Sequence, residues 1–231
     1  GMFDKHGKAK PVLDEVKNFS EWLSGIEFSL PPATEDAVCL ATKDQDQWGV
    51  MYSCYVLAKQ AGVNIRFADS GSKLPDSDIY LMPSISGNTI MPAQNYAELT
   101  ERVKNGATLY ISNDDGILSG FNDITGVTVN DSETKPVCGS FNLNGNCVNY
   151  ARQRNYIISA DGAEIIAKDD EGNPIFTKYK YGKGIVYYLN FPLEKNLIDV
   201  CDGFEKTQHE VYNEIFREAK DKYPIICNNK F

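Results

Sequence analysis

The feature that most constrains the fold is a regular alternation of short apolar runs with helical segments in the first half of the chain. We expect strands at residues 37–41, 63–68, 78–82 and 107–112, with helices at 48–61 and 92–105. Strands that alternate with helices form a parallel sheet covered by helices on both faces. Because crossover connections are right-handed, few topologies remain, and the sequence predicts an α/β fold of the flavodoxin-like kind.

The second half of the chain has a different pattern, with β-like segments separated by turn residues. These segments lie at residues 126–129, 137–150, 156–160, 164–168, 175–181 and 184–190. Asn144-Gly145 predicts a hairpin turn, and the last segment could rejoin the main sheet. Long helices are expected at 12–24, capped by Gly25, and at 204–222. The expected organisation is a leading segment (1–35), an α/β domain (36–222) with a β-rich insertion (121–183), and an exit segment (223–231).

Composition excludes some classes of partner. The 231 residues include 32 acidic and 23 basic side chains, which gives a net charge of −9. Nucleic acids and anionic membranes both need a basic surface, so neither is expected as a partner. No apolar run reaches the roughly 20 residues of a membrane span. The polar first residues do not form a signal-peptide pattern.

The six cysteines indicate neither a zinc site nor a redox motif, because none forms a CxxC pair. Cys39 and Cys54 lie inside apolar segments and are interpreted as packing residues. Cys138 and Cys147 flank the predicted hairpin. They could form a disulfide across it or remain two free thiols. No metal or cofactor is predicted.

A polar turn at 113–116 follows a buried strand. In an open α/β sheet, such a turn lies at the carboxyl edge, where ligands bind. A hydrolase or amidotransferase would carry Ser or Cys on a sharp turn there, but this chain has Asn113, Asp114 and Asp115. The two carboxylates could serve as a general acid and base or bind a cation. Alternatively, the turn is solvated and Asp114 caps a helix over Gly116.

A second set of polar and aromatic side chains follows the first strand. Asp44, Asp46 and Trp48 suit a sugar, because an aromatic face stacks on C–H groups while carboxylates accept from hydroxyls. Alternatively, Asp46 or Gln47 begins the helix and Trp48 packs or lies at a subunit contact. The full predicted ligand pocket comprises Asp44, Asp46, Trp48, Ser84, Asn113, Asp114, Asp115 and Asn190.

No catalytic residue is predicted. A hydroxyl nucleophile at Ser84, Ser86 or Ser112 would need a nearby base, commonly His. The only histidines are His6, in the leading segment, and His209, in the last predicted helix.

Several motifs together resemble the class I glutamine amidotransferase-like superfamily. They are the tyrosines Tyr52 and Tyr55 on a helix, Ala61-Gly62-Val63, Met82-Pro83, and Val103 followed by Gly106-Ala107. The closest similarity is to the domain that follows the catalytic barrel in family 42 β-galactosidases, often called the trimerisation domain. PIFTKYKYGKGIVYYLNFPLE resembles that domain's closing segment. HGKAKPVLDEVKNFSEWLSGI resembles the tail of a glycosidase barrel, and PIICNNKF the start of a further β-domain.

The resemblance implies a non-catalytic accessory or oligomerisation domain of a glycoside hydrolase-like protein. Such a domain would form dimers or trimers through helix faces and the 121–160 region, or contact neighbouring domains, in the periplasm or outside the cell. The chain departs from true amidotransferases, since no Cys lies at 112–116 and Asn190 follows the last strand in place of His.

Two alternatives remain open from the sequence. One is a carbohydrate-binding or hydrolytic protein that uses the carboxyl-edge pocket. The other is a glycosidase in its own right, which needs two carboxylates about 5–10 Å apart. No sequence pattern places such a pair.

Overall fold

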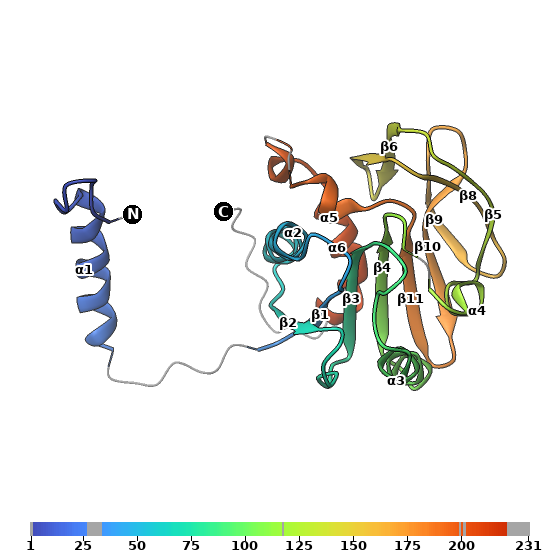
Figure 1. Ribbon diagram of the computed structural model, residues 1–231, viewed down its shortest axis with the longest axis horizontal. Coiled ribbons are helices and arrows are strands. Elements are labelled where there is room, and N and C mark those ends of the chain that lie inside the picture. Colours follow the sequence, from blue (N-terminus) through green and yellow to red (C-terminus); the bar gives the residue numbers. More distant parts are fainter. Residues whose placement is uncertain (1, 27–33, 117, 199, 201, 221–231) are drawn as a thin grey trace. The chain divides into compact units, whose positions relative to one another are not determined.

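The computed structural model describes residues 2–26, 34–116, 118–198, 200 and 202–220. The chain divides into two compact units, Gly1–Thr34 and Glu35–Phe231. The first contains helix α1 (Pro11–Ser24), and the second contains all the remaining helices and strands that are described (Figure 1). Each unit is considered by itself.

Helix α1 begins at Pro11, which suits a first helical position because the N–H that proline lacks would have no partner there. It ends at Gly25, whose N–H donates to the carbonyl of Glu21 at 3.2 Å, as predicted. None of its residues is buried. Leu13 is half-buried, and five other apolar side chains are between 43% and 63% exposed: Val12, Val16, Phe19, Trp22 and Leu23. The described part of the first unit therefore leaves this apolar stripe uncovered.

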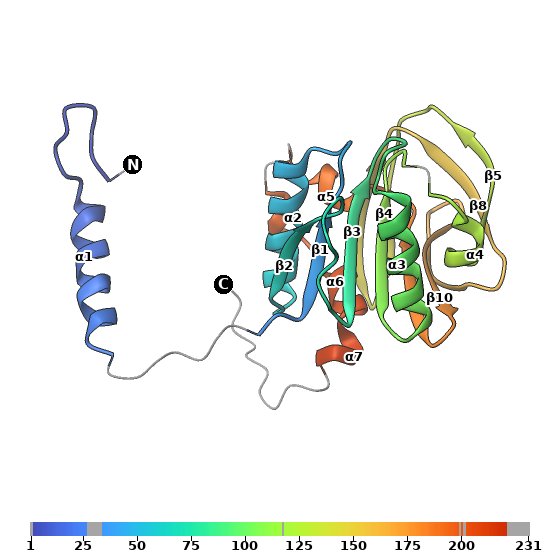
Figure 2. The same cartoon turned by 60° about the horizontal axis from the view of Figure 1, so that its bottom comes forward.

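The second unit is a mixed α/β structure built on a seven-stranded sheet, with the strand order β2-β1-β3-β4-β11-β10-β9 (Figures 1 and 2). The strands are β1 (Ala37–Ala41), β2 (Ile65–Asp69), β3 (Ile79–Ile85), β4 (Thr108–Asn113), β9 (Glu164–Lys168), β10 (Pro174–Tyr181) and β11 (Gly184–Leu189). The four pairs from β2 to β11 are parallel, and β10 and β9 continue the sheet antiparallel. The predicted mostly parallel α/β sheet is thus confirmed.

Helices cover both faces of this sheet. On one face, α2 (Gln47–Gln60), α5 (Leu193–Asn196) and α6 (Glu210–Ile215) border a core that includes Leu57, Leu81 and Tyr212. On the other, α3 (Ala93–Lys104) and α4 (Phe121–Thr125) border a core that includes Leu99 and Ile111. Figure 1 shows α2 and α3 on opposite sides of the sheet. Every residue of β3 is buried, because this central strand is covered from both sides.

Two β ribbons lie beside the main sheet. One pairs β5 (Val127–Glu133) with β8 (Asn155–Ala160), and the other pairs β6 (Val137–Leu143) with β7 (Asn146–Arg152). The predicted hairpin is confirmed: Asn144 and Gly145 both have positive φ, as a tight hairpin turn requires.

Cys138 and Cys147 on this hairpin are free thiols. Cys138 faces Ala151, whereas Cys147 faces Asn142. This register separates the two cysteines by four residues, or about 13 Å along the ribbon, which is too far for a disulfide.

Three expectations about the elements are wrong. Strand β3 continues past Pro83 to Ile85; its pairing with β4 becomes irregular there, so the missing N–H of proline does not end the strand. Over the described residues 204–220, the predicted helix at 204–222 is instead a short 3-10 helix (Gly203–Glu205), α6, and α7 (Arg217–Lys220); residues 221 and 222 lie outside the described residues. Helix α6 buries Val211, Tyr212 and Ile215 in the core, and Phe204 and Ala219 pack against it only partly buried. Strands β9 and β10, expected within an insertion, extend the main sheet.

Candidate functional site

The centre of the carboxyl edge is a buried carboxylate that sequence reasoning missed. Glu194 lies in α5, which follows β11, and is completely buried. Four hydroxyl groups donate to its carboxylate: Ser84 Oγ at 2.9 Å, Ser112 Oγ at 2.5 Å, Tyr110 Oη at 3.0 Å and Tyr212 Oη at 2.9 Å. These donors come from β3, β4 and α6, so Glu194 joins three elements.

This arrangement compensates for the burial of a polar group. A buried carboxylate needs hydrogen-bond donors or an opposite charge. Among the described residues, no basic side chain forms an ion pair with Glu194. The four hydroxyls therefore stabilise the buried carboxylate by donating hydrogen bonds to it. Burial, together with the charge of Glu194, raises the pKa of Tyr110 and of Tyr212. Both phenols therefore stay protonated and able to donate.

Ser84 is the strained residue of the site. Its φ is +43°, a left-handed conformation that non-glycine residues seldom adopt. Its hydroxyl donates to Glu194 and accepts from the backbone N–H of Lys195 at 3.0 Å, while its own N–H donates to Ser112 Oγ at 2.6 Å. Ser84 is fully buried. Its hydroxyl is therefore committed to structure and is not presented to a substrate.

Asp114 does not cap a helix, contrary to one of the two interpretations of this turn. Its Oδ2 lies 2.5 Å from Lys195 Nζ and accepts from Ser86 Oγ at 3.1 Å. The local turn is held instead by Asn113, whose Oδ1 accepts from the N–H of Gly116 at 3.1 Å. The prediction failed because Lys195 is far from Asp114 in the sequence, and a local rule cannot include it.

Asp115 and Asp44 hold the loop after β3 from two sides. The N–H of Gly87 donates to Asp115 Oδ1 at 3.0 Å, and the N–H of Thr89 donates to Asp44 Oδ2 at 3.1 Å. Gly87 has a φ of +70°, and a Cβ there would lie 2.7 Å from Asp44. Glycine is needed at this position because the Asp44 carboxylate occupies that space.

Asn190 links the main sheet to the β5–β8 ribbon. Its Oδ1 accepts from Tyr188 Oη at 3.2 Å, and its Nδ2 donates to the carbonyl of Tyr156 at 2.9 Å. Its own carbonyl accepts from Arg152 Nη1 at 3.1 Å, and Arg152 forms a buried ion pair with Asp169 at 3.3 Å. Asn190 therefore has a structural contact at each polar group.

Asp46 and Trp48 mark the start of α2. The carboxylate of Asp46 accepts from the N–H of Gly49 at 3.0 Å, so Asp46 is the helix cap. Trp48 is 84% exposed and shares its side of the helix with Tyr52 and Tyr55, which are also exposed. We call these three residues the aromatic face of α2.

The structure thus brings five of the predicted residues to the carboxyl ends of β3, β4 and β11: Ser84, Asn113, Asp114, Asp115 and Asn190. Asp44 reaches the same edge through the Gly87–Thr89 loop, and Asp46 and Trp48 lie at the start of α2. The polar atoms of this cluster mostly bond to other protein groups. It therefore offers few free donors or acceptors to a ligand.

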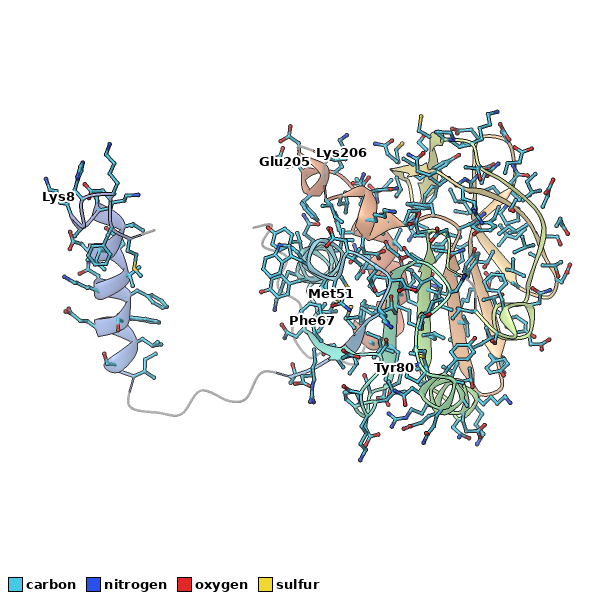
Figure 3. All side chains as sticks on the ribbon, in the orientation of Figure 1. Lys8, Met51, Phe67, Tyr80, Glu205 and Lys206 are labelled. Atoms are coloured by element: carbon cyan, nitrogen blue, oxygen red, sulfur yellow. The ribbon has the colours of Figure 1, made fainter. Side chains whose placement is uncertain are left out.

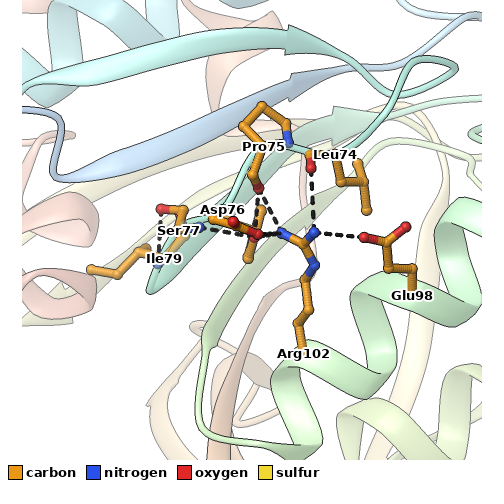
Figure 4. Close-up of polar contacts among 8 residues, drawn as sticks. Leu74, Pro75, Asp76, Ser77, Ile79, Glu98 and Arg102 are labelled. Carbon is orange, nitrogen blue, oxygen red and sulfur yellow. Dashed lines mark hydrogen bonds and ion pairs between the residues drawn. The ribbon is translucent and has the colours of Figure 1, made fainter.

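A cavity of about 690 Å³ lies at the opposite, amino edge of the sheet, and it is lined by none of the predicted residues. Arg102 of α3 is one of its lining residues, and Figure 4 shows the polar contacts of its guanidinium. The guanidinium donates to the carbonyls of Pro75 at 2.7 Å and Leu74 at 3.3 Å, and also to Tyr80 Oη. It pairs with Glu98 at 2.5 Å and Asp76 at 3.1 Å. Arg102 therefore fastens the loop before β3 to α3.

The described residues do not contain three metal-ligating side chains close enough to hold an ion. None of the described helices is long and apolar enough to cross a membrane.

Comparison with known proteins identifies the fold but no sequence family. No family model matches the chain, and no curated protein matches it. Among solved structures, it is similar to the exo-β-1,4-mannosidase Op5Man5 from Opitutaceae bacterium strain TAV5 (14% identity, TM-score 0.68). That match covers 94% of this chain and 41% of the mannosidase.

Two further structures extend the comparison. A β-galactosidase from Rahnella sp. R3 matches at 17% identity and a TM-score of 0.64, over 95% of this chain and 36% of its own. The cytoplasmic protein STM3548 from Salmonella typhimurium matches at 14% identity and a TM-score of 0.57, over 78% of this chain and 97% of its own. This chain therefore has a fold that forms part of larger glycoside hydrolases, and it spans about two fifths of their length or less.

Proposed function

We propose that this chain is a non-catalytic accessory domain of a longer glycoside hydrolase-like protein. The observation that carries the proposal is the extent of the structural match. The mannosidase and the β-galactosidase are matched over 94% and 95% of this chain. Residues 35–231 alone are too few to give that coverage, so the match includes part of the leading segment. This extent supports our proposal that the leading segment belongs together with the α/β unit in a longer protein.

Two features of the fold support a finer assignment. The order β2-β1-β3-β4-β11 is that of flavodoxin-like sheets, which favours the amidotransferase-like class. Ser84, at the end of β3, is not presented as a nucleophile, since it is buried and its hydroxyl donates to Glu194. The combination favours a domain that retains the scaffold without its chemistry.

The uncovered stripe on α1 and the aromatic face of α2 support an assembly role. Large exposed apolar patches mark contact surfaces, and Trp and Tyr are enriched in protein interfaces. We propose that the stripe on α1 packs against a catalytic barrel of the parent protein. We propose that the aromatic face of α2 contributes to contacts between copies, as a dimer or a trimer.

The first test is to read the coding sequence on both sides of this segment and to produce the complete protein. We expect a barrel upstream, glycosidase activity in the complete protein, and none in residues 1–231 alone. Light scattering then gives the oligomeric state of the complete protein and of a Trp48→Ala/Tyr52→Ala variant. Hydrolysis of glycosides by residues 1–231 alone would contradict the proposal. A variant that still assembles would contradict the role of the aromatic face.

A second candidate is carbohydrate binding beside the carboxyl edge. It is favoured by Trp48, which is 84% exposed and lies four residues after Asp44 in the sequence. The match to STM3548 over nearly its whole length also shows that this fold occurs outside large hydrolases. Titration with oligosaccharides, monitored by tryptophan fluorescence, tests it. The chain also contains Trp22, so Trp48→Phe, which retains Trp22, is the control for signal that does not come from Trp48. Absence of saturable binding at millimolar sugar would exclude it.

A further inference from the structure

A buried sulfur cluster lies between α2 and the sheet. Cys39 on β1 and Cys54 on α2 are both fully buried, and their Sγ atoms are 3.3 Å apart. Met51 on α2 brings its Sδ within 3.5 Å of Cys39 Sγ; Figure 3 labels Met51 on this helix. Three sulfur atoms therefore meet where one helix packs on the first strand.

The positions of the two thiols suit a covalent bond. A disulfide joins sulfurs at about 2.05 Å, so the pair needs to approach by only about 1.3 Å. Cys138 and Cys147 provide an internal contrast, because their register holds them on different pairs of the β6–β7 hairpin.

The pair also has a polar connection to the carboxyl edge. Tyr212 Oη lies 3.1 Å from Cys54 Sγ and 2.9 Å from Glu194 Oε1. A phenol has one proton to donate. When Tyr212 donates it to Glu194, its oxygen is free to accept the Cys54 S–H. A chain of hydrogen bonds therefore runs from the thiol pair to the buried carboxylate.

We propose that Cys39 and Cys54 form an oxidisable pair, which becomes an intrachain disulfide between β1 and α2 when the protein meets an external disulfide such as oxidised glutathione. The thiolate of one cysteine attacks the glutathione disulfide and releases one glutathione. The thiolate of the other cysteine attacks the resulting mixed disulfide and releases the second. Two protein thiols and one oxidised glutathione thus give one protein disulfide and two reduced glutathione molecules.

Burial determines when this exchange occurs. Burial, together with Cys54, raises the pKa of Cys39 well above its usual value, so the closed structure holds the Cys39 thiol protonated, and burial shields both thiols from solvent. Exchange takes place when α2 lifts transiently from the sheet. Once formed, the bond closes a loop of roughly 15 residues, which restricts the unfolded chain. We expect it to raise the Tm by about 5 °C.

The experiment equilibrates the purified protein in glutathione buffers from fully reduced to fully oxidised. Exchange is stopped with acid, and free thiols are alkylated in denaturant. After alkylation, we expect the protein with the Cys39–Cys54 disulfide to carry two fewer alkyl groups than the fully reduced protein. Trypsin cleaves after Lys43, so the bond joins the peptides of residues 18–43 and 44–59, which mass spectrometry identifies. Thermal unfolding of the two forms gives the shift in Tm.

Two variants make the result specific. Cys54→Ala removes the crosslink and the oxidative rise in Tm, and circular dichroism verifies that it folds. The double variant Cys138→Ala/Cys147→Ala is the matched control. We expect it to keep the Cys39–Cys54 crosslink and the rise in Tm on oxidation. Full alkylation of Cys39 and Cys54 in the most oxidising buffer would overturn the proposal. So would a bond from either residue to another cysteine, or an oxidised form with no higher Tm.

Discussion

The two edges of the sheet treat polar side chains differently. At the carboxyl edge, carboxylates and hydroxyls are numerous, but Glu194 and Asp114 are each bonded to neighbouring protein groups. At the amino edge, one guanidinium, that of Arg102, holds a loop beside an open cavity. The difference teaches that a concentration of polar residues at the edge where ligands usually bind is not by itself a binding site. The polar atoms must also be free.

Of the substitutions that test this difference between the two edges, removal of Glu194 is expected to have the largest effect. Glu194→Ala leaves four buried hydroxyls without their acceptor, and we expect it to lower the free energy of unfolding by about 3 kcal/mol or more. Urea denaturation measures the effect. Glu194→Gln keeps one acceptor oxygen and is expected to cost less. The matched control is Asp115→Ala on the exposed part of the same edge. If Glu194→Ala and Asp115→Ala lower the free energy of unfolding equally, the hydrogen bonds to Glu194 contribute little to stability.

At the amino edge, Arg102→Ala is expected to lower the free energy of unfolding by about 1–3 kcal/mol, because the carbonyls of Leu74 and Pro75 lose their donor. Arg102→Lys retains the charge but cannot span both carbonyls. We expect limited proteolysis to cut the loop before β3 faster in both variants, and fastest in the alanine variant. A lysine variant that matches the native protein would contradict the fork-like role of the guanidinium.

A smaller effect is expected where the carboxyl edge meets solvent. The side chain of Lys195 is half exposed, so its ion pair with Asp114 is screened by water. Asp114→Asn is expected to lower the free energy of unfolding by less than about 1 kcal/mol. The difference from the native protein shrinks as salt is added. A large, salt-insensitive loss in the free energy of unfolding would contradict this and would indicate that Asp114 behaves like the buried Glu194.

The smallest effect is expected at Tyr96, on α3. Its hydroxyl is buried and has no partner among the described residues. Replacing it by Phe therefore leaves the free energy of unfolding at pH 7 within about 0.5 kcal/mol. Burial, with the nearby Tyr181, raises the pKa of Tyr96 to about 12, whereas an unfolded tyrosine ionises near 10.

The higher pKa of Tyr96 in the folded chain predicts how the stability of the native protein and of the Tyr96→Phe variant will differ at high pH. Between about pH 10 and 12, the unfolded chain releases the Tyr96 proton while the folded chain keeps it. The native protein then loses stability that the Tyr96→Phe variant retains. Urea midpoints at pH 7 and pH 11 test this. A variant that loses as much stability as the native protein between those values would contradict it.

The sequence predicted the parts of the fold that depend on local rules. The alternation of strands and helices, a helix start at Asp46 or Gln47, and the turn at Asn144-Gly145 each follow from neighbouring residues. It also predicted which loops meet at the carboxyl edge, since parallel strands end together there.

Glu194 could not have been predicted in the same way. It lies in a single helical turn with no periodicity, and its donors Ser84 and Tyr110 are far from it in the sequence. The only local sign is a charged residue directly after apolar Phe191 and Leu193, which indicates burial but not a partner. The pairing of Asp114 with Lys195 was missed for the same reason.

The single turn of α5 also has a consequence for motion. It carries both the carboxylate that receives four hydroxyls and the backbone N–H that donates to Ser84. If α5 moves away from the sheet, the hydrogen bonds of Glu194 and the bond from the Lys195 N–H to Ser84 break together. We therefore expect the ends of β3 and β4 and the start of α6 to open as one cooperative unit, with a common free energy of opening in amide hydrogen exchange.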